Sequence, residues 1–213
     1  MLKSFIDRHY RLIRPFRGLY GWAKDSHSRA KCSQRAAEWE AKKFVGAKLD
    51  VCGGRNPFNP KEFLNVDAVA LPQVDLVFDI TEKFPMDDGI IAEVFSAATL
   101  EHLREIHNVH VLKEFFRIMQ PGARVRICTP DIEAIAKGIL DGEDLPYINQ
   151  HLFGKYKSNQ TEDYDLHKWM YPADKLMEVL REIGFTDTKR IPLEEVGLHD
   201  PKYNFLVSAI KPR

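Results

Sequence analysis

The segment LDVCGGRNP at residues 49–57 decides the fold of this chain. Its apolar start followed by two glycines, Gly53 and Gly54, is typical of a buried strand that runs into a tight loop. About a dozen residues later comes a second short apolar run, FLNVD at residues 63–67, which ends at Asp67. Because an acidic residue at the tip of the neighbouring strand accepts hydrogen bonds from a ribose diol in nucleotide-binding α/β folds, we expect a ligand site at this edge.

Short apolar runs alternate with helical segments throughout the rest of the chain. Strands are predicted at 47–52, 63–67, 75–79, 92–96 and 123–128. A long amphipathic helix is predicted between the last two, ending before the turn at Pro121-Gly122, and another helix at 172–183 stops at Gly184. The runs FTDTKRI and YNFLVSAI follow as a predicted antiparallel edge. Strands that are apolar on both faces and alternate with helices indicate an α/β fold with a mostly parallel sheet.

The amino-terminal arm is basic, with 12 Lys/Arg against 4 Asp/Glu in residues 1–48, although the whole chain has no net charge. Apolar residues from Leu2 to Phe16 recur at helical spacing, which predicts a basic amphipathic helix interrupted near Pro15. A second helix is predicted at 33–45, with Ser33 as its cap. Packing on its own domain is the favoured interpretation of the arm, and peripheral contact with a membrane surface is the alternative.

Length and composition predict one domain with additions. The chain has 213 residues, of which 44% are hydrophobic, and we divide it into a basic helical extension at 1–45 and a domain at 46–213. Residues 141–171 lack clear periodicity and are interpreted as a substrate or lid insertion. The three cysteines are odd in number and form no C-x-x-C pair, and no apolar run reaches about 18 residues. A cytoplasmic protein is therefore expected.

The order of the motifs resembles that of class I S-adenosylmethionine-dependent methyltransferases. The likeness extends to a group of small methyltransferases often associated with polysaccharide biosynthesis, whose first motif reads like LDLGCG. It covers residues 47–210 and includes, besides the first motif, the segments Asn65–Asp67, Asp79–Ile80, Leu100–Leu103 and Met119–Gly122. The resemblance implies a Rossmann-like three-layer sandwich, whose mostly parallel seven-stranded sheet has an antiparallel C-terminal edge strand and an N-terminal helical extension.

The resemblance also implies a set of residues for the cofactor, S-adenosylmethionine. Cys52, Gly53 and Gly54 would line its methionine end, and Asp67 would hold the ribose hydroxyls. The adenine would lie near Asp79 and against Ile80, while the floor of the pocket would comprise Asp50, Ser96 and Ala97. For Asp50 and Asp79 the alternative is a carboxylate that caps a turn. One departure concerns Cys52, which stands where the family pattern has its first glycine.

Methyl transfer to a hydroxyl requires a base close to the aligned acceptor. His167 lies in the segment DLHKWMY at 165–171, which also resembles its counterpart in these methyltransferases, and it is the favoured base because imidazole titrates near neutral pH. His102 is the second candidate, with a structural hydrogen-bonding role as the alternative. Asp131 follows the fifth strand and is expected either to contact the acceptor or, as we favour, to cap the next helix.

His107, His110 and Glu114 fall at helical spacing, as metal ligands on one helix face do. A solvated stripe produces the same spacing, so no metal site is predicted. The expected acceptor is a hydroxyl or amine of a small or glycan-like molecule, by analogy with the resembling group.

Three other functions are alternatives to methyl transfer to such an acceptor. A nicotinamide-dependent oxidoreductase requires glycines spaced G-x-G-x-x-G, which residues 52–57 do not supply. A methyltransferase-fold binding module without turnover is an alternative because Cys52 alters the loop. An RNA methyltransferase would use the basic arm, but an N-P-P-Y-like turn is replaced by Ser96-Ala97-Ala98-Thr99, which argues against methylation of an adenine or cytosine amino group.

Overall fold

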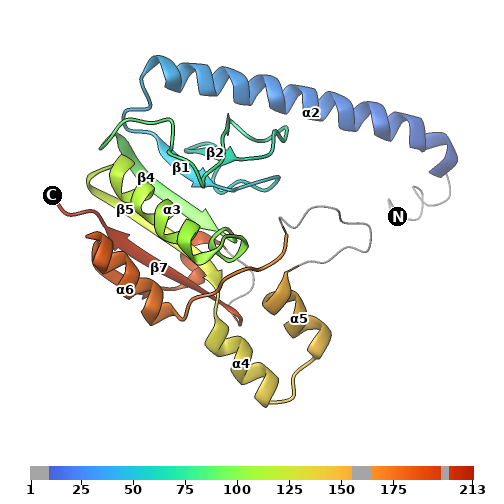
Figure 1. The fold of residues 1–213 in the computed structure, drawn as a ribbon. Coiled ribbons are helices and arrows are strands. Elements are labelled where there is room, and N and C mark those ends of the chain that lie inside the picture. Colours follow the sequence, from blue (N-terminus) through green and yellow to red (C-terminus); the bar gives the residue numbers. More distant parts are fainter. Residues whose placement is uncertain (1–9, 155–164, 198–201) are drawn as a thin grey trace.

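The computed structural model describes residues 10–154, 165–197 and 202–213, with side chains from residue 25 onward. The strands are β1 Lys48–Val51, β2 Phe63–Asp67, β3 Leu76–Val77, β4 Ile91–Ala97, β5 Met119–Pro130, β6 Thr186–Ile191 and β7 Asn204–Ile210. The helices are α2 Tyr10–Ala41, α3 Glu105–Ile118, α4 Ile132–Leu140, α5 Leu145–Phe153 and α6 Ala173–Ile183, with the 3₁₀ helices η1 Leu100–His102 and η2 Leu193–Val196. Figure 1 shows their arrangement.

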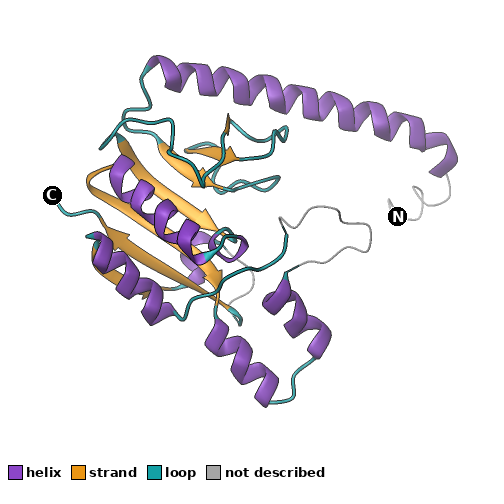
Figure 2. Ribbon diagram, viewed as in Figure 1, coloured by secondary structure: helices purple, strands orange, loops and turns teal. Residues whose placement is uncertain are grey.

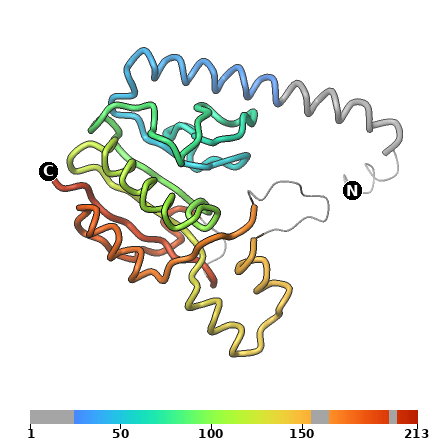
Figure 3. Tube along the Cα trace, in the orientation of Figure 1, coloured from blue at the N-terminus to red at the C-terminus, as the bar shows by residue number. Residues whose placement is uncertain are grey.

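The described strands form one seven-stranded sheet in the order β3-β2-β1-β4-β5-β7-β6. β1 to β5 pair in parallel, which confirms the predicted α/β sheet. The C-terminal strand β7 is antiparallel, as predicted, and lies one position in from the edge, between β5 and β6. Figure 3 traces the path of the chain from the N-terminal helix to this last strand. The register pairs Val51 with both Val66 and Ser96, so the carboxyl ends of β1, β2 and β4 lie side by side.

Helices α3 and α6 cover one face of the sheet (Figure 2). Their apolar residues, such as Phe115 and Leu180, join the inward side chains of the strands in the main core. The opposite face packs a smaller cluster that includes Phe63, Phe95 and Leu206. There the Arg126 guanidinium lies 5.1 Å from the centre of the Phe58 ring, a cation–π contact that lets a charged side chain cover an apolar face.

The prediction of two amino-terminal helices is wrong, because α2 runs without a break from Tyr10 to Ala41. Pro15 does not interrupt it, and Ser33 lies within it and is no cap. No glycine or proline occurs between residues 22 and 41, so nothing in the chain ends the helix there. Arg35 fastens α2 to the sheet through ion pairing with Asp75 and a 3.0 Å hydrogen bond to the Phe63 carbonyl. No helix within the described ranges has both the length and the apolar character needed to cross a membrane.

The insertion at 141–171 contains regular structure that its lack of periodicity did not predict. Helix α5 occupies Leu145–Phe153, begins at Asp144, whose side chain accepts a 3.3 Å hydrogen bond from the Tyr147 amide, and packs on α4. The buried Ile148 joins Ile135 and Tyr203 in a small separate core. This packing across elements stabilises a helix whose own sequence pattern is weak. Residues 155–164 of the insertion lie outside the described residues.

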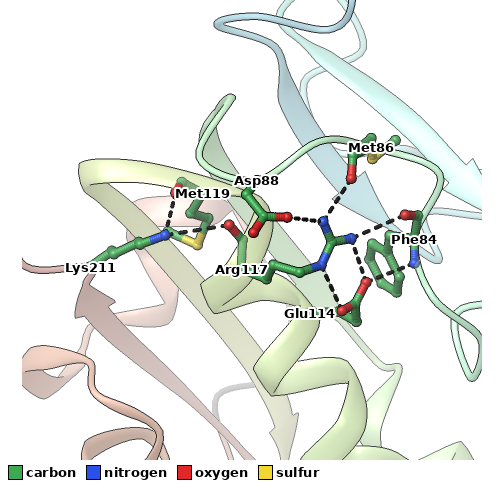
Figure 4. A network of polar contacts seen from close by, with 7 residues as sticks. All are labelled: Phe84, Met86, Asp88, Glu114, Arg117, Met119 and Lys211. Carbon is green, nitrogen blue, oxygen red and sulfur yellow. Dashed lines mark hydrogen bonds and ion pairs between the residues drawn. The ribbon is translucent and has the colours of Figure 1, made fainter.

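An ion-pair network fastens the segment before β4 to α3 (Figure 4). Arg117 donates to both carboxylate oxygens of Glu114, at 2.8 and 2.7 Å, and to Asp88 at 2.7 Å. It also donates to the carbonyls of Met86 and Phe84, at 2.8 and 3.1 Å. Glu114 in turn accepts a 2.8 Å hydrogen bond from the Phe84 amide. One buried pair therefore satisfies the backbone of a loop that has no regular structure.

Lys211 supports the carboxyl end of the same helix. Its ammonium donates to the Met119 carbonyl at 2.8 Å and to the Arg117 carbonyl at 3.4 Å (Figure 4). The last carbonyls of a helix have no partner within the helix, and a cation there is favoured by the helix dipole. The end of the chain thereby stabilises the junction between α3 and β5.

Candidate functional site

The loop after β1 is closely packed around Gly53. A Cβ atom on Gly53 would lie 2.7 Å from Asn65 Oδ1 and 2.8 Å from Asp50 Cγ, and closer still to Asp50 Oδ2. Real side chains never approach so closely, so only glycine fits. Asp50 itself accepts a 2.7 Å hydrogen bond from the Phe58 amide, which closes the loop at its far end. Asp50 thus stabilises the loop. This is the turn-capping role expected from the sequence as the alternative to a place in the pocket floor.

Asn65 holds the loop from the neighbouring strand. Its amide nitrogen donates to the carbonyls of Gly54 and Gln73, both at 2.9 Å. No role was predicted for this residue, although it stands in the Asn65–Asp67 motif. The sequence feature that could have revealed its role is a polar side chain inside an otherwise apolar strand. Such an amide is fully buried and needs hydrogen-bond partners.

Cys52 has a left-handed backbone conformation, with φ of 63°. Such a conformation costs a residue with a Cβ roughly 1–2 kcal/mol, which glycine avoids. The position at which this chain departs from the family pattern is therefore one at which the backbone favours glycine. Burial raises the pKa of the Cys52 thiol to about 12, so the sulfur is protonated and packs as an apolar atom.

This backbone strain predicts which of two variants at position 52 is the more stable. Cys52→Ala keeps the left-handed cost and loses the packed sulfur, whereas Cys52→Gly loses the sulfur but removes the cost. We expect the glycine variant to be more stable than the alanine variant by about 1 kcal/mol, measured by urea denaturation. An alanine variant as stable as the glycine variant would show that φ at this position carries no strain.

Asp67 lies at the tip of β2, facing the glycine loop. One carboxylate oxygen accepts a 2.9 Å hydrogen bond from the Val69 amide, which orients the side chain. The other lies 3.9 Å from where a Cβ on Gly54 would be. The charge of Asp67 also raises the pKa of both Asp50 and Cys52. A partly exposed carboxylate beside a glycine loop is the arrangement expected for binding vicinal hydroxyls.

Burial raises the pKa of Asp50 to about 7, with the nearby Asp67 adding to the shift. The folded protein therefore keeps a proton that the unfolded chain releases near pH 4, so this group makes stability fall as the pH rises towards 7. Asp50→Asn removes the titration but keeps an oxygen for Phe58. We expect the free energy of unfolding of this variant, relative to the unmodified protein, to rise by about 2 kcal/mol between pH 5 and pH 7. A constant difference across this range in urea denaturation would contradict the shift.

The remaining residues implied for the cofactor differ in exposure: Asp79 is exposed, whereas Ile80 and Ser96 are buried. Asp79 Oδ1 accepts from the amide and the hydroxyl of Thr81, both at 2.8 Å, and these hydrogen bonds lower its pKa. This is the turn-capping alternative. Ile80 is buried in the main core. Ser96 is buried, and Ala97 packs against the smaller cluster on the other face.

A second group of side chains gathers at the end of β4, where Glu101, His102 and His167 meet. One nitrogen from each ring and one oxygen of Glu101 all lie within 4.8 Å of one another. The two rings meet edge to face, with centroids 5.0 Å apart. The fold thus brings together the two candidate bases, which are far apart in sequence.

Hydrogen bonds orient all three side chains. His102 Nδ1 contacts the Leu166 carbonyl at 3.2 Å, and His167 Nδ1 contacts the His151 carbonyl at 2.7 Å. Glu101 accepts a 3.1 Å hydrogen bond from the Thr129 hydroxyl. The backbone of this segment is also joined, because the Lys168 amide donates to the Glu101 carbonyl at 2.6 Å.

Burial shifts the pKa of each member of this group towards its neutral form. The pKa of Glu101 rises to about 7, that of His102 falls, and that of His167 falls to about 4, with the neighbouring His102 contributing to the last shift. Both imidazoles are therefore neutral at pH 7, with a lone pair available. A conjugate acid of pKa about 4 also makes His167 a weak base.

The group lies close to the glycine loop. The Thr99 hydroxyl, just before η1, donates to the Val51 carbonyl at 3.1 Å. The turn at Ser96–Thr99 was expected to form part of the pocket floor, whereas no role was predicted for Glu101. Its position after β4 could have identified Glu101 as a residue of the site, because the carboxyl ends of parallel strands lie at the same edge of a sheet.

Asp131 caps α4, as favoured from the sequence. Its Oδ1 accepts from the amides of Glu133 and Ala134, at 3.2 and 3.4 Å, and its Oδ2 pairs with Arg190 at 3.0 Å. Both oxygens are engaged and the side chain is buried. A role in contacting the acceptor stays a prediction.

The fold is shared with solved S-adenosylmethionine-dependent methyltransferases. A protein of this description from Methanosarcina mazei is 16% identical, with a TM-score of 0.54 over 79% of this chain and 93% of that one. One from Thermotoga maritima, given as a possible histamine N-methyltransferase, is 14% identical, with a TM-score of 0.53 over 95% and 99% of the two chains. One from Archaeoglobus fulgidus is 14% identical, with a TM-score of 0.53 over 90% and 100%.

No protein-family model and no curated protein matches the sequence. At the identities found, the structural likeness shows the fold alone. The Rossmann-like methyltransferase fold that the motifs predicted is confirmed in this way.

Proposed function

We propose that the chain is a methyltransferase that binds S-adenosylmethionine at the carboxyl ends of β1, β2 and β4. The observation that carries this proposal is the glycine loop, in which Gly53 is packed without room for a side chain and Asp67 faces Gly54. The backbone around Gly54 leaves space for a ligand to approach, and Asp67 offers an anionic acceptor for the ribose hydroxyls. The shared fold supports the same placement, because ligands of open α/β sheets bind beyond the carboxyl ends of the strands.

The acceptor we propose is a hydroxyl or amine of a small or glycan-like molecule. His102 and His167 support this proposal, because they lie at the same edge of the sheet with neutral rings and oriented lone pairs. Methyl transfer from a sulfonium is a displacement in line with the departing sulfur, so the chain would mainly align the acceptor with the methyl group. The base role predicted for His167 is part of this proposal.

The test is calorimetric titration of the purified chain with S-adenosylhomocysteine. We expect the intact protein to bind and Asp67→Ala to weaken binding by about 10–100-fold, because two charge-assisted hydrogen bonds to the ribose are lost. Asp174→Ala is the matched control, since it removes an exposed carboxylate at the start of α6 and should leave binding unchanged. Absence of binding by the intact protein would overturn the proposal.

A second candidate is a binding module that keeps the fold without turnover. The observation in its favour is the side chain of Cys52, which stands in a left-handed position of the loop where the family pattern has glycine. This candidate predicts that S-adenosylhomocysteine binds while no methyl group is transferred to any sugar, phenol or amine offered. Methylation of one such acceptor would exclude it.

A further inference from the structure

The group formed by Glu101, His102 and His167 has the composition of a metal site. Two imidazoles and one carboxylate are the protein ligands of many catalytic zinc sites and of non-haem iron sites. Their donor atoms lie within 4.8 Å of one another. Two atoms bound to one ion at about 2.1 Å are at most roughly 4.2 Å apart, so a small inward movement of the side chains would complete the site.

The orientation of the imidazoles is the second observation. A carbonyl only accepts hydrogen bonds, so the Nδ1 atoms that contact the carbonyls of Leu166 and His151 carry the protons. The Nε2 atoms then carry the lone pairs. Metal-binding histidines almost always donate the other ring N–H to a carboxylate, a backbone carbonyl or water, which fixes both the tautomer and the ring orientation.

The burial of Glu101 is the third observation. Only 2% of this residue is exposed, and among the described residues it forms no ion pair. Thr129 orients its carboxylate through a neutral hydrogen bond of 3.1 Å. Burying a carboxylate without a cation is costly, and a divalent ion would supply the missing charge.

The surrounding backbone holds the three ligands together. The amides of Lys168 and Trp169 donate to the Glu101 carbonyl, at 2.6 and 3.3 Å, and the His167 amide donates to the Phe153 carbonyl at 3.1 Å. Gly154 makes this approach possible, because a Cβ there would lie 3.1 Å from His167 Cδ2 and closer still to the Asp165 carbonyl oxygen. Ligands on two segments, η1 and the chain around His167, are thus positioned before any ion binds.

We propose that Glu101, His102 and His167 bind one divalent transition-metal ion of the zinc type. Two nitrogen ligands favour such an ion over magnesium or calcium, which prefer oxygen. The helical spacing of His107, His110 and Glu114 was interpreted as a solvated stripe and not as a metal site, and Arg117 occupies both oxygens of Glu114.

Three protein ligands leave at least one position of the ion open. If the proposed methyl transfer takes place, on which this step alone rests, a hydroxyl of the acceptor would bind at that position and its pKa would fall. A lone pair that binds a metal accepts no proton, so the metal site and a histidine base are alternative uses of the same atoms.

The test measures metal binding by the full chain without cofactor. Protein stripped with a chelator would be titrated with Zn²⁺ by calorimetry and with Co²⁺ by visible absorption, whose d–d bands report the ligands. We expect one ion per chain and at least a tenfold loss of affinity in His102→Ala and in His167→Ala. His110→Ala, which removes a histidine of α3 outside the group, should bind as the unmodified protein does.

Gly154→Ala provides a second variant that changes no ligand. It should weaken Zn²⁺ binding by displacing His167, and circular dichroism would establish that each variant is folded. No uptake by the intact protein, or equal uptake by all variants, would overturn the proposal. Titrating the metal-free protein with S-adenosylhomocysteine separates the two ideas, because cofactor binding at the glycine loop does not require the ion.

Discussion

Arg117→Ala is expected to lower the free energy of unfolding by about 3–5 kcal/mol, because it leaves a buried carboxylate without its partner. The side chains of Arg117 and Glu114 are only 19% and 10% exposed. The substitution also removes a donor to the carbonyls of Met86 and Phe84, of which the Phe84 carbonyl keeps a 2.8 Å hydrogen bond from the Met86 amide (Figure 4). Urea denaturation followed by circular dichroism measures the loss.

Two further variants separate the causes. Asp88 is 77% exposed, so Asp88→Ala should cost no more than about 1 kcal/mol. Adding Glu114→Gln to Arg117→Ala should recover part of the stability, because the buried charge is then removed as well. A loss below about 1 kcal/mol in Arg117→Ala would show that the network contributes little.

Gly53→Ala is expected to reduce the affinity for S-adenosylhomocysteine at least about 100-fold, by displacing the loop on which the cofactor is proposed to lie. The new methyl group would collide with Asp50 and Asn65, which are packed on both sides of the loop. Neither can withdraw easily, since Asp50 is bound by the Phe58 amide and Asn65 donates to two carbonyls. Calorimetry measures the affinity, and urea denaturation any loss of stability.

Gly142→Ala is the control for this variant. Gly142 has a left-handed φ of 74° and open space around it, so its substitution should cost about 1 kcal/mol of stability and leave binding unchanged. Combining Gly53→Ala with Asp50→Ala should restore part of the stability if Asp50 causes the collision. Unchanged binding in Gly53→Ala would place the cofactor elsewhere.

The elements that the sequence predicted well depend on local signals. β2 has the predicted bounds, and α6 ends at Gly184, whose left-handed φ of 118° terminates the helix. The predictions for β2 and for the end of α6 are confirmed because strand periodicity and a glycine cap are signals that act within a few residues. The predicted bounds of α2 are wrong, because a capping residue such as Ser33 begins a helix only where the preceding chain is not already helical.

The glycine loop and its acidic neighbour were readable from the sequence for the same reason. A glycine pair after an apolar strand, and an aspartate at the end of the next, lie at one edge of any parallel sheet. The sequence did not predict whether a given aspartate faces a ligand or instead accepts hydrogen bonds from the protein backbone. Asp67 and Asp79 each accept from the amide two residues further on, but only Asp67 also lies beside a glycine of the loop, whereas Asp131 caps α4. Each role depends on which groups the surrounding chain places beside the carboxylate.

By itself, the sequence determined a parallel α/β sheet, a glycine loop at its carboxyl edge and an acidic residue beside that loop, since each follows from local periodicity or from the absence of a side chain. Only the tertiary structure decided that His102 and His167 share one site with the buried Glu101. Leu166 and His102 are 64 residues apart and are joined by a hydrogen bond that packing alone creates. No short-range pattern encodes such a contact, because it depends on how β4, α5 and the segment after it pack together in space.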